Sequence, residues 1–228
     1  METYYPEYPQ MKPLTKESFE LRDIALSEKV SLFETLPDLA QPVESLYPIK
    51  MEDLGQSYGY LLYHTEASWD ADEEKIRVID GRDRMQLFVD GELVTTQYQA
   101  EIGQDIFVTG KKKATHQIDI LIENMGRVNY GHKFLADTQR KGIRTGVCKD
   151  LHFLLDWQQY PLPLENTENI DFSKGWQPKQ PAFYAFDFEI KALKDTYLDL
   201  SGFGKGVAFV NGVNIGRFWN VGPTLSLY

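Results

Sequence analysis

The fold is decided by the stretch His116-Gln-Ile-Asp-Ile-Leu-Ile-Glu-Asn-Met-Gly-Arg-Val-Asn-Tyr-Gly131. In its first half three isoleucines occupy every second position, which places them together on one face of a strand. Isoleucine is branched at its β-carbon and packs better on a pleated sheet than in a helix. The second half contains Gly126 and Gly131, and it therefore predicts a shaped loop at the end of the strand.

The loop between these two glycines presents Arg127, Asn129 and Tyr130. Polar and aromatic side chains on a loop beside a rigid strand are suited to a binding surface. The same residues would also fit a solvated connection in which Tyr130 packs over the sheet edge. Residue types alone leave both interpretations open, and exposed polar loops of the second kind are the commoner.

The composition is ordinary for a globular protein and argues against one class of partner. The 228 residues are enough for one or two domains, and the hydrophobic and charged fractions, 42% and 25%, are typical of globular chains. Aromatic residues make up 13% of the chain, which favours β-structure. The formal net charge is −10, whereas nucleic-acid binding needs clustered lysine and arginine, so we expect no nucleic-acid partner.

Signals for secretion and membrane insertion are missing from these residues. Cys148 is the single cysteine, so no disulfide can form within the chain. There is no Asn-x-Ser/Thr acceptor, no apolar run of roughly 18 residues, and no basic apolar segment after Met1. These features predict a cytoplasmic setting without a membrane partner, although a chain cut from a larger protein could have lost such signals.

A short motif recurs about one domain length apart. Phe88-Val-Asp-Gly91 returns as Phe209-Val-Asn-Gly212, each time between strand-like residues. A strand, Asp-Gly or Asn-Gly and a second strand give the strongest short-range hairpin signal, because this turn needs positive φ at both central residues. The repeat predicts two related β-units. It also predicts that valine is tolerated less well at Gly91 or Gly212 than at Gly110.

Three weaker local signals complete the assignment of elements. Asp80-Gly81 predicts a turn, and the alternating aromatic and apolar residues of Phe183–Ile190 predict a strand. Loose alternation within residues 25–36 predicts another strand. Many short strands with turn signals and almost no helical periodicity characterise β-sandwiches, so the sequence predicts an all-β chain.

The expected division of the chain has three parts. Residues 1–24, rich in proline, form an extended lead-in. Residues 25–147 form a first β-sandwich, and residues 148–228 form a second one. The second supplies only four or five strands, whereas such sandwiches use about eight, so we expect it to be incomplete.

The sequence offers no convincing constellation for catalysis or metal binding. The four histidines are scattered, and the acidic loop Asp70–Glu74 lacks the glycine turn of an EF-hand, so a solvated loop explains it more simply than calcium binding. Gly202-x-Gly-x-Gly206 precedes a strand where a phosphate loop would require a helix. Cys148 has no histidine partner, and core packing accounts best for the four tryptophans. We therefore expect no catalytic residue, metal site or cofactor.

Three longer motifs carry a resemblance to a known family. They are Glu123-Asn-Met-Gly-Arg-Val-Asn-Tyr-Gly131, Asp156-Trp157 with Tyr160-Pro161-Leu162, and Lys205-Gly-Val-Ala-Phe-Val-Asn-Gly-Val-Asn-Ile-Gly-Arg-Phe-Trp-Asn-Val-Gly-Pro223. Together they resemble the C-terminal β-domains of family 35 glycoside hydrolases, the β-galactosidases. The resemblance runs from about residue 21 to the last residue. It implies two galactose-binding-like jelly rolls, which in that family follow a (β/α)8 barrel that carries both catalytic glutamates.

The resemblance also implies a role for the loop. In that family the tyrosine of the motif Asn-x-Gly-Arg-x-Asn-Tyr-Gly reaches the galactose pocket at the mouth of the barrel. The motif is intact here, so the resemblance implies that Tyr130, Asn129 and Arg127 bind substrate. The whole enzyme would hydrolyse terminal β-galactosyl residues with two carboxylates of its barrel, and 228 residues without βα alternation cannot contain that barrel.

The leading hypothesis is therefore a non-catalytic β-sandwich region, inactive alone, that packs on the catalytic barrel and completes its galactoside pocket. One alternative is an independent carbohydrate-binding module with its own sugar site. Another is a structural or dimerising domain, and a homodimer is left open. An open reading frame for a barrel upstream of Met1 would distinguish the first hypothesis from the others.

Overall fold

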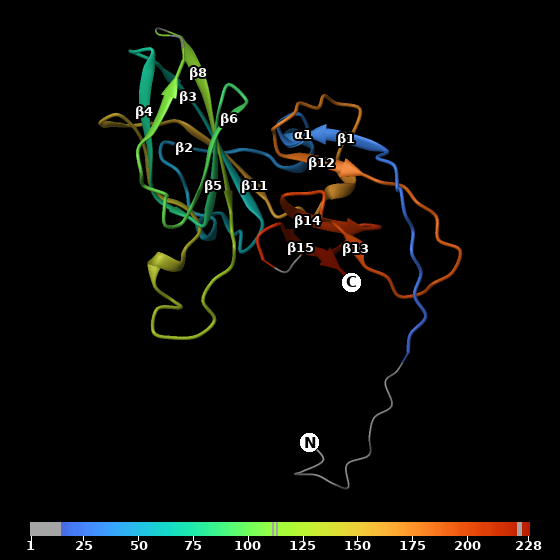
Figure 1. The fold of residues 1–228 in the computed structure, drawn as a ribbon. Helices are drawn as coiled ribbons and strands as arrows, with labels where there is room; N and C mark the ends of the chain where they lie inside the picture. The colour runs from blue at the N-terminus through green and yellow to red at the C-terminus, as the bar shows by residue number, and fades with distance from the viewer. Residues whose placement is uncertain (1–14, 111, 113, 223–224) are drawn as a thin grey trace. The chain divides into compact units, whose positions relative to one another are not determined.

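The computed structural model describes residues 15–110, 112, 114–222 and 225–228, which form two compact units (Figure 1). The larger unit is Glu28–Tyr184. The smaller unit combines the described residues before Glu28 with Ala185–Tyr228. Strands are the main regular element of both units, which confirms the all-β class.

A six-stranded antiparallel sheet forms one layer of the larger unit. In spatial order its strands are β2 (Val43–Ser45), β11 (Trp157–Leu162), β3 (Tyr60–Ser68), β8 (Thr115–Glu123), β5 (Arg84–Val89) and β6 (Glu92–Tyr98). The central strands β3 and β8 lie side by side along their whole length, from Tyr60 opposite Glu123 to Ser68 opposite Thr115 (Figure 1). Strand β8 is the one that the three alternating isoleucines predict.

A four-stranded sheet forms the second layer. Its strands, again in spatial order, are β10 (His152–Phe153), β9 (Gly142–Lys149), β4 (Glu73–Arg82) and β7 (Ile106–Thr109). Alternate side chains of both sheets meet in one core, which holds the fully buried Tyr63 and Trp157 together with Ile118, Ile120 and Ile122. The larger unit is therefore the expected sandwich, because each sheet buries one face against the other.

The single α-helix among the described residues is α1 (Leu32–Leu39), which follows β1 (Glu28–Ser31); β1 pairs with β12 (Ala182–Ala185). Leu32, Leu36 and Leu39 are buried at the spacing of one helical face. The strand expected within residues 25–36 is therefore wrong beyond Ser31, because Leu32 and Leu36 fit both the strand and the helix period. Three short 3-10 helices complete the unit: η1 (Glu52–Leu54), η2 (Asp137–Gln139) and η3 (Thr167–Asn169).

The predicted hairpin turns are confirmed, and a third predicted turn is not. Asp90 and Gly91 have φ angles of 51° and 77° and join β5 to β6. Asn211 and Gly212, with φ angles of 49° and 79°, join β14 to β15. Asp80-Gly81 lies inside β4, where the register with β9 shifts, so the positive φ of Asp80 belongs to a bulge that bends a continuing strand.

The smaller unit consists of two antiparallel strand pairs. Strand β13 (Leu198–Asp199) pairs with β16 (Ser226–Leu227), and β14 (Lys205–Val210) pairs with β15 (Val213–Trp219). Leu200, Ala208 and Phe218 form its buried core. None of the helices in the described ranges is long and apolar enough to cross a membrane.

The divisions between the units differ from the expected ones. Residues 148–184 belong to the larger unit, because β10 pairs with β9 and β11 pairs with β3. The described part of the lead-in, from residue 15, belongs to the smaller unit. Its backbone bonds to Asp195, with hydrogen bonds from Phe19 N to Asp195 O (3.2 Å) and from Asp195 N to Glu17 O (3.1 Å). Residues 1–14 lie outside the described part. The strand predicted over Phe183–Ile190 ends at Ala185.

Candidate functional site

The loop between β8 and β9, residues 124–141, extends away from the end of the six-stranded sheet and is here called the tyrosine loop (Figure 1). Hydrogen bonds of Asn124 anchor its first residues. Asn124 donates from its backbone to Gly59 O (3.1 Å) and from its side chain to Ser57 O (2.9 Å). Its side-chain oxygen accepts a bond from Gly126 N (2.9 Å), and Gly126 has a φ of 102°, which closes the first turn of the loop.

Arg127 faces the segment that precedes β3. One guanidinium nitrogen donates to Ser57 O at 2.7 Å, and another forms an ion pair with Glu52. The side chain is about 30% exposed. The predicted site residue Arg127 is therefore bonded to the segment that precedes β3, where Glu52 balances its positive charge.

Asn129 and Tyr130 lie between Gly126 and Gly131, in the part of the loop that is here called its tip. Tyr130 is 92% exposed, although tyrosine is a large side chain that usually packs against its own chain. Both side chains lack a hydrogen bond to any other residue in the described part of the chain. Gly131, with a φ of 108°, turns the backbone immediately after them. The loop thus presents one phenol ring and one amide outward, while its beginning is anchored.

The other end of the loop is anchored as well. Lys141 N donates to both carboxylate oxygens of Glu52, at 3.1 and 2.9 Å. The buried Lys141 ammonium donates to both oxygens of Asp83, at 2.7 and 2.6 Å. Asp83 also accepts a bond from Met125 N at 2.8 Å. Sequence reasoning missed Glu52, Asp83 and Lys141, and no local pattern marks them, because their partners lie far away along the chain.

A basic cluster borders this end of the loop. Arg144 donates to Asp137 at 2.8 Å, and this bond, together with the charges of Lys50, Arg144 and Arg140, holds the pKa of Asp137 below its usual range. Asp137 lies in η2, within the loop. Its ionised carboxylate therefore adds a further tie between the loop and β9.

Other predicted features have structural roles. In the acidic loop Asp70–Glu74, the buried Glu74 accepts bonds from Asp70 N (2.6 Å) and Ala71 N (2.9 Å). The residues that the structure describes contain no group of three side chains suited to a metal ion. Cys148 is half-buried, and burial raises the pKa of its thiol. Trp69 and Trp157 lie in the core, as predicted. The same prediction is wrong for Trp176 and Trp219, which are only partly buried and lie under the ammonium groups of Lys29 and Lys205.

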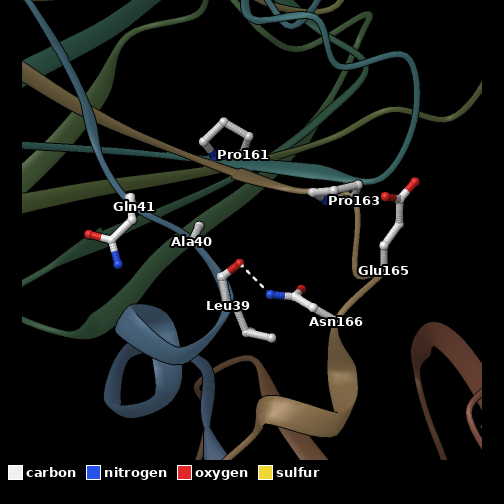
Figure 2. Close-up of a pocket in the computed structure, with 7 residues that line it drawn as sticks. All are labelled: Leu39, Ala40, Gln41, Pro161, Pro163, Glu165 and Asn166. Carbon is white, nitrogen blue, oxygen red and sulfur yellow. Dashed lines mark hydrogen bonds between the residues drawn. The ribbon is translucent and has the colours of Figure 1, made fainter.

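A separate open pocket of about 340 Å³ lies beside α1 (Figure 2). Its lining residues are Leu39, Ala40, Gln41, Pro161, Pro163, Glu165 and Asn166. Two of its polar side chains already have partners, since Asn166 donates to Leu39 O at 3.0 Å and Glu165 accepts a bond from Tyr58. The pocket includes none of the predicted site residues, and the tyrosine loop remains the candidate site.

The chemistry open to the tyrosine loop is recognition. A phenol ring can lie against the apolar face of a sugar while its hydroxyl donates or accepts a hydrogen bond. The amide of Asn129 can do both as well. General acid and nucleophile would require two facing carboxylates. The carboxylates of Glu52, Asp83 and Asp137 instead each accept bonds that anchor the loop. The fold and the loop define an all-β chain whose larger unit carries one anchored loop with an exposed tyrosine.

Comparison with known proteins identifies the family. Residues 48–163 match the family model described as the first all-beta domain of beta-galactosidase, and residues 181–228 match the galactose-binding domain of beta-galactosidase. The chain belongs to the β-galactosidase family, which confirms the resemblance. The two matched ranges also agree with a division near residue 184.

Curated relatives match most of this chain. A beta-galactosidase of Xanthomonas manihotis is 37% identical over 206 residues, which cover 89% of this chain and 33% of the relative. Beta-galactosidase 17 of Arabidopsis thaliana is 34% identical, with coverages of 96% and 36%. The chain thus spans about a third of the length of these relatives. Among solved structures, a GH2 beta-galacturonidase from Eisenbergiella tayi is 13% identical, and the match covers 65% of this chain and 26% of that chain. Its TM-score of 0.35 is too low to support any inference.

Proposed function

We propose that this chain serves a β-galactosidase as the non-catalytic region that packs on a catalytic (β/α)8 barrel and completes its galactoside pocket with Tyr130. The observation that carries the proposal is the 92% exposure of Tyr130 at the tip of a loop whose two ends are anchored. A tyrosine held outward on a fixed loop has no role in the core of its own unit. It is available to a ligand or to a neighbouring domain.

The three predicted binding residues have different parts in this proposal. Tyr130 and Asn129 face outward and contact the sugar or the rim of its pocket. Arg127 is bonded to Ser57 and Glu52, so its part is to hold the tip in place. The barrel supplies the acid, the nucleophile and most of the pocket, so the 228 residues alone bind galactose weakly.

The experiment that tests the proposal is steady-state kinetics of a β-galactosidase that carries this chain. Tyr130→Phe removes one hydroxyl, and Tyr130→Ala removes the ring as well. Loss of such a contact costs about 1–3 kcal/mol when a polar partner is left unpaired. We therefore expect Tyr130→Ala to lower kcat/KM by about one to two powers of ten, and Tyr130→Phe to lower it less.

Thermal unfolding of the same variants is the control. The melting temperature should stay unchanged, because Tyr130 packs against little of the chain. A Tyr130→Ala enzyme with the wild-type kcat/KM and a lower melting temperature would assign the residue to folding. Tight galactose binding by the 228-residue chain alone would favour an independent carbohydrate-binding module. The cytoplasmic setting and a homodimer stay predictions.

A further inference from the structure

Two carboxylates, Glu52 and Asp83, each bond to both ends of the tyrosine loop. Glu52 joins Arg127, near the beginning of the loop, to the backbone of Lys141 at its end. Asp83 joins Met125 N at the beginning to the Lys141 ammonium at the end. The tip that bears Tyr130 is therefore the closed part of a loop whose two ends are held together by shared acceptors.

The platform beneath these contacts belongs to the core of the larger unit. Met51 is fully buried, and its backbone nitrogen donates to Lys141 O at 3.0 Å. The buried Tyr63 hydroxyl donates to Ile49 O at 2.7 Å and accepts a bond from Ile143 N at 3.0 Å. Glu52 follows Met51 directly, so its carboxylate starts from a backbone position that the core fixes.

The two carboxylates differ in how much a substitution would destabilise the larger unit. The Asp83 and Lys141 side chains are only 10% and 4% exposed, and removal of one partner from a buried pair leaves an uncompensated charge that destabilises the whole unit. The Glu52 side chain is 26% exposed, at the rim, where water can replace lost bonds. Glu52 is the member of this network whose change can affect the loop without unfolding the sandwich.

We propose that Glu52 is a positioning residue for Tyr130. Its carboxylate accepts bonds from the Arg127 guanidinium and the Lys141 backbone, and thereby restricts the loop tip to one orientation. This inference rests on the proposed function of Tyr130. Its physical basis is preorganisation, because a side chain held in place before binding loses less conformational freedom when the sugar arrives.

The first measurement is amide hydrogen exchange of residues 127–136 in the 228-residue chain. Glu52→Gln keeps the size of the side chain, but its NH₂ group cannot accept a bond, so one of the two donors loses its partner. We expect exchange in the loop to become about tenfold faster, and Glu52→Asp to give an intermediate rate. Asp105→Asn is the matched control, since the Asp105 side chain is 30% exposed and bridges Arg77 and Lys75 without touching the loop.

The second measurement is kinetics in a β-galactosidase that carries this chain. Glu52→Gln should lower kcat/KM about three- to tenfold at an unchanged melting temperature, and the same change should have almost no effect when Tyr130 is already alanine. Such non-additivity separates positioning of Tyr130 from general destabilisation.

The outcomes distinguish this inference from the proposed function. Unchanged exchange in Glu52→Gln overturns the inference, as does faster exchange with a wild-type kcat/KM in an enzyme where Tyr130→Ala is impaired. Equal losses from Glu52→Gln with and without Tyr130 overturn it too. If Tyr130→Ala itself has no kinetic effect, the proposed function fails, while faster exchange would still establish that Glu52 restrains the loop.

Discussion

At Gly110, tolerance to substitution depends on the neighbouring side chains more than on the backbone conformation of the glycine itself. A β-carbon built at Gly110 would lie 2.6 Å from Cζ3 of Trp69 and 3.0 Å from Cε1 of His116. At Gly91 the nearest atom is Nε2 of the flexible Gln180 side chain, at 3.1 Å, and the obstacle is the φ of 77°. These contacts reverse the sequence-based expectation that Gly91 is the less tolerant position, because Gly110 lies against the buried side chains of Trp69 and His116.

The reversal gives a prediction. Gly110→Ala should destabilise the larger unit by about 2–3 kcal/mol, because it overpacks the buried Trp69 ring. Gly91→Ala should cost about 1 kcal/mol, the usual penalty for a positive φ outside glycine. Urea unfolding followed by tryptophan fluorescence measures both. A larger loss at Gly91 than at Gly110 would restore the expectation from turn chemistry.

Among the elements, the strands that could be predicted from the sequence are those with a strict period of two and a glycine turn beside them. Strand β8 and the two hairpins belong to this group. Helix α1 was missed, because eight residues with leucines at positions 32 and 36 satisfy both periods. The tip of the tyrosine loop could be predicted from its motif. Its anchors could not, because contacts such as Lys141 with Asp83 depend on tertiary folding alone.

The pairing of β3 with β8 contains a cross-strand ion pair that makes stability depend on pH. His64 lies opposite Asp119, and their side chains are 2.7 Å apart. The hydrogen bond to Asp119 raises the pKa of His64, with additional contributions from the charges of Asp119 and Glu66, while burial opposes them. A raised histidine pKa stabilises the folded state fully below the ordinary value of about 6.5, and the stabilisation disappears as pH rises through the folded pKa.

We therefore expect Asp119→Asn to lower the free energy of unfolding by about 1 kcal/mol more at pH 5.5 than at pH 9. Chemical denaturation at the two pH values measures the difference. In a His64→Gln background the effect of Asp119→Asn should be the same at both. Equal losses at pH 5.5 and pH 9 in the otherwise native chain would show that the pair does not titrate in this way.

At the scale of the whole molecule, the described residues contain two β-units and one eight-residue α-helix, which excludes a (β/α)8 barrel within them. The class of fold and the family could both be predicted from the sequence, because long motifs and alternating strands carry that information. The division near residue 184 could not, because it depends on which distant strands β10 and β11 join.

This architecture predicts that the purified 228-residue chain does not hydrolyse a chromogenic β-galactoside, since glycoside hydrolysis needs two facing carboxylates on one rigid framework. The assay compares the chain with its Tyr130→Ala variant, prepared in the same way to reveal contaminating enzyme. Turnover that persists through purification and differs between the two preparations would place a catalytic centre in the chain itself.

The contact of the lead-in with Asp195 bears on the order in which the protein can form during synthesis. Residues 17–19 emerge from the ribosome early, but their hydrogen-bond partner follows only after the entire larger unit has been made. Domains generally fold as units while translation proceeds, so the sandwich is complete before the smaller unit has both of its pieces. The segment that precedes the larger unit along the chain is thus among the last to form its contacts.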